Sequence, residues 1–313
     1  MQTQPTTTSA TSARDRFRVD VEDAATFSTR RIGRLRHNFH EHPLMQLPEL
    51  ERLAKELMPI DGCRFIRPGL DQGSKFDIGP KPTDGRTIDE VFRQLEEPAS
   101  WIALYNVERI PRYEALLTEA LATVRPFVER DQSGIFLITG FIFISAPPSV
   151  TPFHIDRENN FWLQIRGRKV MNVWDHTDRV VVPARDVEEF IVNHAMDSIR
   201  LKDAFRPRSH EFDVGPGDGV YFPSTSPHMT RSDRDWVKPG DGISVSIGVN
   251  FYTPLTRTHA RVHQFNEAIR RFGVNPTSPG VSIVKDLIKA PVGRVLGAAR
   301  ALRRGEKLAP GSY

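Results

Sequence analysis

The chain has 313 residues, a formal net charge of +4, 39% hydrophobic residues and 26% charged residues, a balance typical of a globular protein with a sizeable core. It contains no run of about 18 apolar residues, so the sequence predicts no transmembrane helix. The single cysteine, Cys63, excludes an internal disulfide framework and a cysteine-rich zinc site, and the N-terminus lacks an apolar leader, so we expect a cytoplasmic protein.

The charge is unevenly distributed along the chain. Residues 257–313 carry eleven Lys and Arg against three Asp and Glu, or +8, which leaves −4 for residues 1–256. A basic segment can contact an acidic partner, RNA or an anionic membrane surface, but a solvated helix face is the simpler interpretation. We therefore expect no nucleic-acid partner, although the basic segment does not exclude one.

The N-terminal part mixes polar stretches with short helical patterns. Residues 1–18 are rich in Thr, Ser and Gln and are expected to form a disordered tail. Residues 47–57 carry apolar side chains at helical spacing. Residues 19–133 as a whole are expected to form a helical and mixed segment that packs on the rest of the protein.

Three further elements are predicted before residue 134. Residues 87–97 begin with a capping box of Thr87 and Glu90 and carry an apolar helical face. Residues 101–110 are typical of a strand. Residues 111–125 predict a helix, because the segment begins with a proline and continues with strong helix formers up to the next proline.

The pattern changes to short β-type runs at residue 134. Between residues 134 and 256 these runs are separated by Gly, Pro, Asp and Ser, a spacing typical of a β-sandwich or barrel. From residue 257 the pattern becomes helical again. The sequence therefore predicts an α+β protein with a mainly β core at 134–256 and a basic helical segment at 257–313.

Two of the β-type runs predict a hairpin. The runs NFWLQI and KVMNVW are joined by the turn Arg166-Gly167-Arg168. Because side chains alternate along a strand, one face of each run is expected to carry a set of three residues: Asn160, Trp162 and Gln164 on the first, and Lys169, Met171 and Val173 on the second. A lysine among apolar strand residues requires an anion nearby.

Two His-x-Asp pairs are candidate metal ligands. His154 and Asp156 precede the first run, whereas His176 and Asp178 lead into a segment with no lysine before Lys202. Such a pair is weak evidence by itself, because chance alone would produce one in about every two chains of this composition. The first pair is favoured because polar residues and a lysine follow it at strand spacing.

A third ligand is expected from a later strand. His228 follows the predicted strand Val220–Phe222, which ends at Pro223. Two imidazoles and one carboxylate on one face of an iron leave three positions open, enough for a bidentate 2-oxo acid and dioxygen. Lys169 and the Thr151 hydroxyl can bind the far carboxylate of that acid.

Four motifs carry a family resemblance: TPFHID at 151–156, NFWLQIRGRK at 160–169, GDGVYFP with a later His at 217–228, and VNFY at 249–252. With them the chain resembles the JmjC, cupin-like branch of Fe(II)- and 2-oxoglutarate-dependent oxygenases, and is similar to the asparaginyl hydroxylase that inhibits hypoxia-inducible factor. The resemblance covers about residues 100–255. It implies a double-stranded β-helix, the jelly-roll or cupin barrel, flanked by N- and C-terminal helices.

The resemblance also implies roles for individual residues. The iron ligands that carry catalysis would be His154, Asp156 and His228. The residues that contact or lie near 2-oxoglutarate would be Thr151, Lys169, Asn160, Asn250 and, from an earlier strand, Tyr105. The predicted activity is that of a dioxygenase that hydroxylates an unactivated C–H bond in a protein side chain or small molecule and releases succinate and CO2.

Two alternatives stay open. One is a cupin metalloenzyme that does not use 2-oxoglutarate, against which Lys169 argues. The other is a non-catalytic module that docks RNA or an acidic partner through its basic segment, against which the intact triad argues. Iron content and 2-oxoglutarate binding distinguish the three hypotheses.

The substrate and the assembly are less clearly indicated. Three segments, 69–85, 185–215 and 231–242, are expected to be substrate-selecting loops, and none carries a signature of its ligand. Residues 281–304 have apolar residues at helical spacing together with several Lys and Arg. We expect a homodimer that forms through these C-terminal helices, as in the similar hydroxylase.

Overall fold

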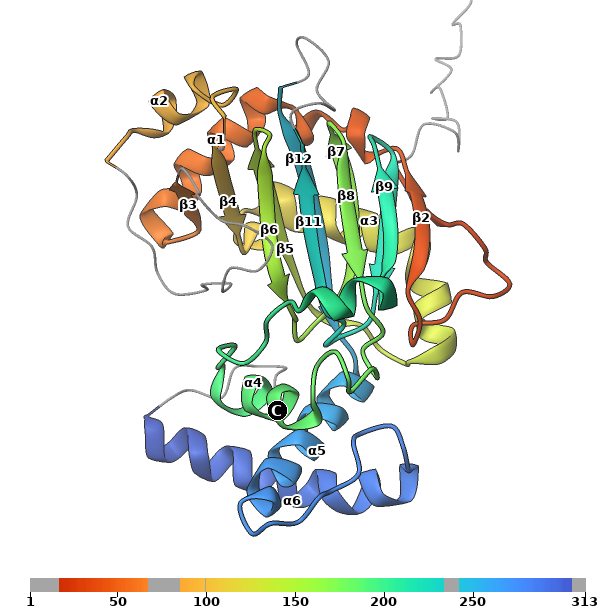
Figure 1. The fold of residues 1–313 in the computed structure, drawn as a ribbon. Coiled ribbons are helices and arrows are strands. Elements are labelled where there is room, and N and C mark those ends of the chain that lie inside the picture. The colour runs from red at the N-terminus through yellow and green to blue at the C-terminus, as the bar shows by residue number, and fades with distance from the viewer. Residues whose placement is uncertain (1–16, 67–84, 99, 234–241, 306–313) are drawn as a thin grey trace, which may run out of the picture.

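The fold consists of two antiparallel sheets with helices packed around them (Figure 1). The computed structural model describes residues 17–66, 85–98, 100–233 and 242–305. One sheet has eight strands in the order β1-β2-β10-β7-β12-β5-β4-β3, and the other has four in the order β6-β11-β8-β9. The prediction of an α+β protein with a mainly β core is confirmed.

The strands have the following bounds. The larger sheet contains β1 (Val19–Val21), β2 (Gly33–His37), β3 (Cys63–Ile66), β4 (Trp101–Tyr105), β5 (Phe136–Ser145), β7 (Asn159–Arg166), β10 (Asp218–Phe222) and β12 (Ser244–Tyr252). The smaller sheet contains β6 (Ser149–His154), β8 (Lys169–Val173), β9 (His210–Val214) and β11 (His228–Ser232).

Within the described ranges, six α-helices accompany the sheets: α1 (Leu47–Leu57), α2 (Ile88–Arg93), α3 (Pro111–Asp131), α4 (Ala184–Asn193), α5 (Pro254–Arg270) and α6 (Ile283–Arg304). Short 3-10 segments lie at Phe39–Glu41, Pro43–Met45, Met58–Ile60, Val107–Arg109 and Asp203–Arg208. Both hydrogen bonds of the predicted capping box at the start of α2 are present. Among the helices of the described residues, none is both long and apolar enough to cross a bilayer.

Helix α3 covers the outer face of the larger sheet and is longer than predicted. The prediction that it ends at residue 125 is wrong, because it continues through Pro126 to Asp131. An internal proline removes one backbone hydrogen bond and crowds the preceding turn. Two tertiary contacts offset that cost: Val128 is fully buried in the core, and the Asp131 carboxylate accepts hydrogen bonds from Ser28 and Thr29.

The predicted hairpin of residues 160–174 is also wrong. β7 pairs with β10 and β12 in the larger sheet, whereas β8 pairs with β9 and β11 in the smaller one. The chain changes sheets at Gly167, which has φ +68° and where an added Cβ would lie 2.6 Å from the Ile243 carbonyl oxygen. Only glycine therefore fits this crossing.

The alternation of side chains nevertheless places the predicted inward residues between the sheets. Trp162 of β7 packs with Met171 and Val173 of β8 in one buried cluster that also contains Phe212 and Phe222. The opposite face of β7 contributes to the core beneath α3. Both faces of β7 are buried, which explains the uninterrupted apolar run Phe161-Trp162-Leu163 in its sequence.

The prediction that residues 185–215 form a loop is wrong. The segment contains most of α4, a 3-10 turn and β9. The apolar residues of α4 pack in a second core cluster with Phe153 and Trp174. In Figure 1, α4, α5 and α6 gather at one end of the two sheets. Residues 1–16, 67–84 and 234–241, which include most of the predicted tail and most of the other two predicted loops, lie outside the described residues. The prediction of disorder is wrong for the last two residues of that tail, because Phe17 packs beside Phe39 and the Arg18 amide donates to Asn38.

Candidate metal centre

Three predicted ligands meet at the end of the smaller sheet that lies nearest to α4, α5 and α6. His154 ends β6 and His228 begins β11, and the two are register partners across that strand pair. Nε2 of His154 lies 3.9 Å from Asp156 Oδ1, and Nε2 of His228 lies 3.5 Å from Asp156 Oδ2. All three ligand atoms lie within 4.8 Å of one another, and no other group of His, Cys, Asp and Glu among the described residues does so.

Backbone carbonyls fix the orientation of both imidazoles. His154 Nδ1 donates to the Pro152 carbonyl at 2.7 Å, and His228 Nδ1 donates to the Ser226 carbonyl at 3.0 Å. Each ring therefore directs its Nε2 toward Asp156, the arrangement that metal-binding histidines usually show. The β6–β11 register shifts beside His154, where Pro152 could not donate to a regular ladder.

The electrostatic environment favours neutral imidazole. Burial, followed by the neighbouring His154, lowers the pKa of His228 to about 4. His228 is therefore uncharged near neutral pH, and a metal ion need not displace a proton to bind it. The Asp156 side chain is more exposed than the two rings and faces the adjoining cavity.

The triad opens into a cavity of about 230 Å³ between the two sheets. That volume is below the roughly 300–1,000 Å³ typical of sites for drug-sized ligands. The cavity is lined by all three triad residues and by four other predicted site residues, Tyr105, Thr151, Asn160 and Lys169. The structure thus brings together seven of the eight predicted residues.

Lys169 is a buried cationic residue of this cavity. It begins β8, is 3% exposed, and burial lowers its pKa to about 8. Within the described residues, no hydrogen bond or ion pair reaches its ammonium group. A buried charge is costly unless it is paired, so an anion in the cavity would supply what this side chain lacks.

Several buried oxygen atoms around the cavity also lack partners. Asn160 Oδ1, Thr230 Oγ1 and Ser246 Oγ make no hydrogen bond in the described part of the chain. All three residues line the cavity. Because buried polar atoms are normally hydrogen-bonded, these atoms indicate that the cavity receives a polar ligand or ordered water.

Asn250 is the predicted residue that does not line the cavity. It is fully buried on β12 as the register partner of Asn160. An added Cβ at Gly248 would lie 3.2 Å from the side-chain oxygen of each asparagine. Gly248 therefore leaves space for the two amides beside the cavity wall.

Tyr105 ends β4 at the edge of the cavity. Its ring makes edge contacts with Phe141 and Phe143 of β5, and the Arg64 guanidinium lies 4.8 Å from the ring centroid. Burial raises the pKa of the Tyr105 hydroxyl to about 12, so it stays a hydrogen-bond donor.

Sequence reasoning missed other lining residues, among them Phe141, Phe143, Glu158, Phe190 and Met196. The alternation of the two phenylalanines in GFIFIS was a usable signal for one face of β5. Glu158 lies two residues after Asp156 and accepts a hydrogen bond from Tyr252. Nothing local marks Phe190 and Met196, which tertiary packing alone brings to the site.

The second His-x-Asp pair forms no comparable cluster. His176 Nδ1 lies 3.6 Å from Asp175, and Asp178 accepts a hydrogen bond from Arg208 at 2.6 Å. Among the described residues, no third donor joins His176 and Asp178.

Comparison with known proteins gives a family match over the core. Residues 132–255 match the family model of the JmjC domain. No curated protein matches the sequence.

Among solved structures, the chain is similar to Escherichia coli YcfD, with 18% identity over 86% of this chain and 65% of that chain and a TM-score of 0.47. A second YcfD structure, a ribosomal oxygenase in complex with cobalt and 2-oxoglutarate, has 17% identity over 85% and 63% of the two chains and a TM-score of 0.45. The DMSP lyase DddQ from Ruegeria pomeroyi has 15% identity over 36% and 37% and a TM-score of 0.22.

The chain spans about two thirds of the length of the YcfD chains that it matches. The family match includes the strands from β5 to β12 and all three residues of the triad. The matched region is the part of the chain that carries the three candidate metal ligands.

Proposed function

We propose that this protein is an Fe(II)- and 2-oxoglutarate-dependent oxygenase that hydroxylates an unactivated C–H bond. The observation that carries the proposal is that the triad shares a small cavity with Lys169, a buried ammonium group that no anion reaches within the described residues. A metal centre explains the three ligands, and an acidic co-substrate explains the lysine.

The three ligands fit a ferrous ion. His154 and His228 offer imidazole nitrogens and Asp156 a carboxylate, the two-histidine, one-carboxylate donor set of non-haem iron oxygenases. Backbone carbonyls hold both rings in the required tautomer. This support is rigid, because it comes from β6, β11 and the turn that precedes β11.

The cavity residues fit 2-oxoglutarate. Lys169 would pair with the distal carboxylate, and the hydroxyls of Thr151 and Tyr105 and the amide of Asn160 would donate hydrogen bonds nearby. When bound, the metal couples oxidative decarboxylation of 2-oxoglutarate by dioxygen to hydroxylation of the substrate, with release of succinate and CO2. We assign Asn250 a supporting role behind Asn160.

The apolar lining residues would keep water away from the reaction. Phe141, Phe143 and Trp162 form an aromatic wall, and Phe190 and Met196 approach from the α4 side. Exclusion of water strengthens the interaction between Lys169 and an acidic ligand. It also protects a reactive oxidant from side reactions.

We propose a double-stranded β-helix for the catalytic core at residues 134–256. Its eight strands, β5 to β12, divide equally between the two sheets, as in jelly-roll folds. Residues 19–133 and 257–313 would be flanking segments. The cytoplasmic location stays a prediction, which fractionation of cells would test.

For the substrate we propose a protein side chain or a small molecule, and for the assembly a homodimer through α6. An exposed apolar stripe on α6 supports the dimer: Val284, Ile288, Val295 and Leu302 are each more than two thirds exposed and spaced by four or seven residues. That spacing is typical of helices that associate along a seam.

The test of the function is succinate formation by purified protein with Fe(II), 2-oxoglutarate and oxygen. Lys169→Ala should lower the rate of this uncoupled turnover and weaken 2-oxoglutarate binding, whereas Lys285→Ala, which removes an exposed lysine on α6, should change neither. Iron binding without any 2-oxoglutarate binding would favour a different cupin enzyme. Failure to bind both would favour a docking module.

A further inference from the structure

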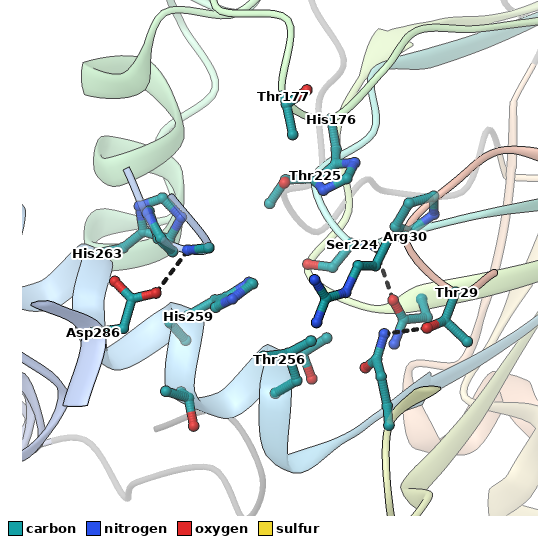
Figure 2. A pocket seen from close by; sticks show the side chains of 18 of the residues that line it. Thr29, Arg30, His176, Thr177, Ser224, Thr225, Thr256, His259, His263 and Asp286 are labelled. Atoms are coloured by element: carbon teal, nitrogen blue, oxygen red, sulfur yellow. Dashed lines mark hydrogen bonds between the residues drawn. The ribbon is translucent and has the colours of Figure 1, made fainter. Parts of the chain in front are cut away.

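A second and larger cavity, of about 530 Å³, lies beside the metal centre. Its walls come from residues 29–30, the segment after β8, the turn after β10, α5, and the start of α6 (Figure 2). Exposed residues such as Arg30, Val281 and Leu287 line it, so it reaches the protein surface. None of the functional residues proposed above lines it.

This cavity gathers cationic and imidazole side chains. Arg30, Arg179, His176 and His259 all line it, and Figure 2 shows Arg30, His176 and His259 converging on the same space. Burial lowers the pKa of Arg179, and no hydrogen bond or ion pair reaches its guanidinium within the described residues. Because a sequestered charge is normally paired, the arrangement lacks an anion.

The acidic residues nearby do not fill that role. Asp175 already accepts two hydrogen bonds from Thr177, and Asp178 accepts one from Arg208. Glu188, the other acidic neighbour of Arg179, forms a bidentate pair with Arg270.

Two buried atoms on the α5–α6 side of the cavity also lack partners. His263 is 5% exposed and its Nδ1 makes no hydrogen bond in the described part of the chain, and the same holds for Oδ1 of Asp286, which is 7% exposed. The other Asp286 oxygen accepts from the Gly280 amide. These two atoms could each form a polar contact with a ligand, on a different side of the cavity from the arginines.

A metal does not explain the cluster. Of the His, Cys, Asp and Glu side chains in the described ranges, only the triad has donors close enough to share an ion. The ligand suited to two guanidinium groups is instead an anion, because these groups bind carboxylate and phosphate with planar, directional hydrogen bonds. Apolar residues Leu255, Ile283 and Leu287 provide contact area for an organic body.

The cavity shares a wall with the metal centre. Thr225 lines it, and the Thr225 amide donates to the Asp156 carbonyl at 2.8 Å. Thr225 has φ +64°, a strained conformation for a β-branched residue that marks many functional sites. Arg157 lines both cavities, so a ligand here would lie directly behind the segment that carries the metal ligand.

We propose that this cavity is a second binding site for a small organic anion, a carboxylic acid or phosphate ester. The acidic group lies against Arg179, Arg30 and His259. A hydroxyl or amino group of the ligand donates to Asp286, and the apolar body packs on α5 and α6. This site does not depend on the proposed oxygenase activity, because it uses a separate set of residues.

Isothermal titration calorimetry with phenyl phosphate, benzoate and inorganic phosphate tests the site. We expect one molecule of phenyl phosphate or of benzoate to bind per chain. The probe with the higher affinity shows whether the site prefers a phosphate or a carboxylate. Inorganic phosphate should bind more weakly because it lacks an apolar body. The absence of binding by all three probes at millimolar concentration would overturn the proposal.

Variants locate the binding. Arg179→Met and His259→Phe should each lower the affinity for the tighter-binding probe by about 30-fold or more. This is the loss expected when one partner of a buried charge-assisted contact is removed. Arg185→Met, which removes an exposed arginine on α4, should have no effect. Lys169→Met should also leave binding unchanged. If Lys169→Met abolishes binding while Arg179→Met does not, the probe occupies the triad cavity and the proposal fails.

Thermal unfolding without any probe provides a second readout. Since Arg179 carries an unpaired and sequestered charge, Arg179→Met should leave Tm unchanged or raise it. A structural arginine would behave in the opposite way. A clear fall in Tm would mean that Arg179 stabilises the fold through its charge, and would count against a ligand-binding role.

Discussion

His154 and His228 are register partners across β6 and β11, and their ring centroids lie 4.1 Å apart. The backbone ladder between the two strands, together with one carbonyl bond to each ring, fixes this separation. Asp156 follows His154 by two residues and completes the triad. Two-thirds of the triad therefore depends on strand pairing between segments more than seventy residues apart in the sequence.

Removal of a triad residue should abolish metal binding. Loss of a partner that only orients a ligand typically lowers affinity by about 10–100-fold, so Asp156→Ala should cost more than that and stop succinate formation. Inductively coupled plasma spectrometry and titration with Co(II) would measure this. The matched control is His210→Ala, which removes an exposed histidine on β9. Wild-type cobalt affinity in Asp156→Ala would contradict the ligand assignment.

Burial of Lys169 should make the stability of the ligand-free protein depend on pH. Its pKa falls from 10.5 to about 8 in the folded chain, so the unfolded chain binds more protons between those two values. The free energy of unfolding should therefore rise with pH through that window, by about 3 kcal/mol, and the full penalty should be present below pH 8.

Urea unfolding at pH 7, 9 and 10 measures this effect. Lys169→Met should be more stable than the wild type at pH 7 by a similar amount, and the difference should shrink as pH rises. Lys285→Met is the control for an exposed lysine. A destabilised Lys169→Met at pH 7 would show that the ammonium group has a structural partner.

Two glycines of α6 should respond differently to alanine. An added Cβ at Gly293 would lie 1.8 Å from the Arg261 carbonyl oxygen of α5, whereas at Gly297 the nearest atom, Cδ of Gln264, is 3.5 Å away. Gly293→Ala should force α5 and α6 apart and cost about 1–3 kcal/mol or more. Gly297→Ala should be neutral or stabilising by up to about 1 kcal/mol. Chemical denaturation compares them, and equal effects would contradict the close approach.

The exposed stripe of α6 should mediate dimer formation. Val295→Asp places a charge in the middle of the stripe and should convert a dimer into a monomer without loss of fold. Sedimentation velocity at micromolar concentrations measures the mass. Val180→Asp, at an equally exposed apolar position outside α6, is the control. A monomeric wild type over that range would contradict the proposed dimer.

The sequence by itself determined the class of the fold and the residues to examine at the site. Period-2 apolar runs after residue 134, the helical spacing in α1 and the Thr87–Glu90 capping box are local patterns, and local patterns are read directly from adjacent residues. The motifs around His154, Lys169 and His228 likewise identified six residues that line one cavity, and the family resemblance added Tyr105.

The tertiary structure alone decided how these pieces meet. The partners of β7 and β8 lie in different sheets, because Gly167 permits a crossing that resembles a hairpin turn in the sequence. Helix α3 passes Pro126 because Val128 and Asp131 find distant partners. The second cavity brings Arg30, Arg179 and His259 together from three separate segments. No local pattern encodes such encounters, because they arise from long-range packing that offsets local preference.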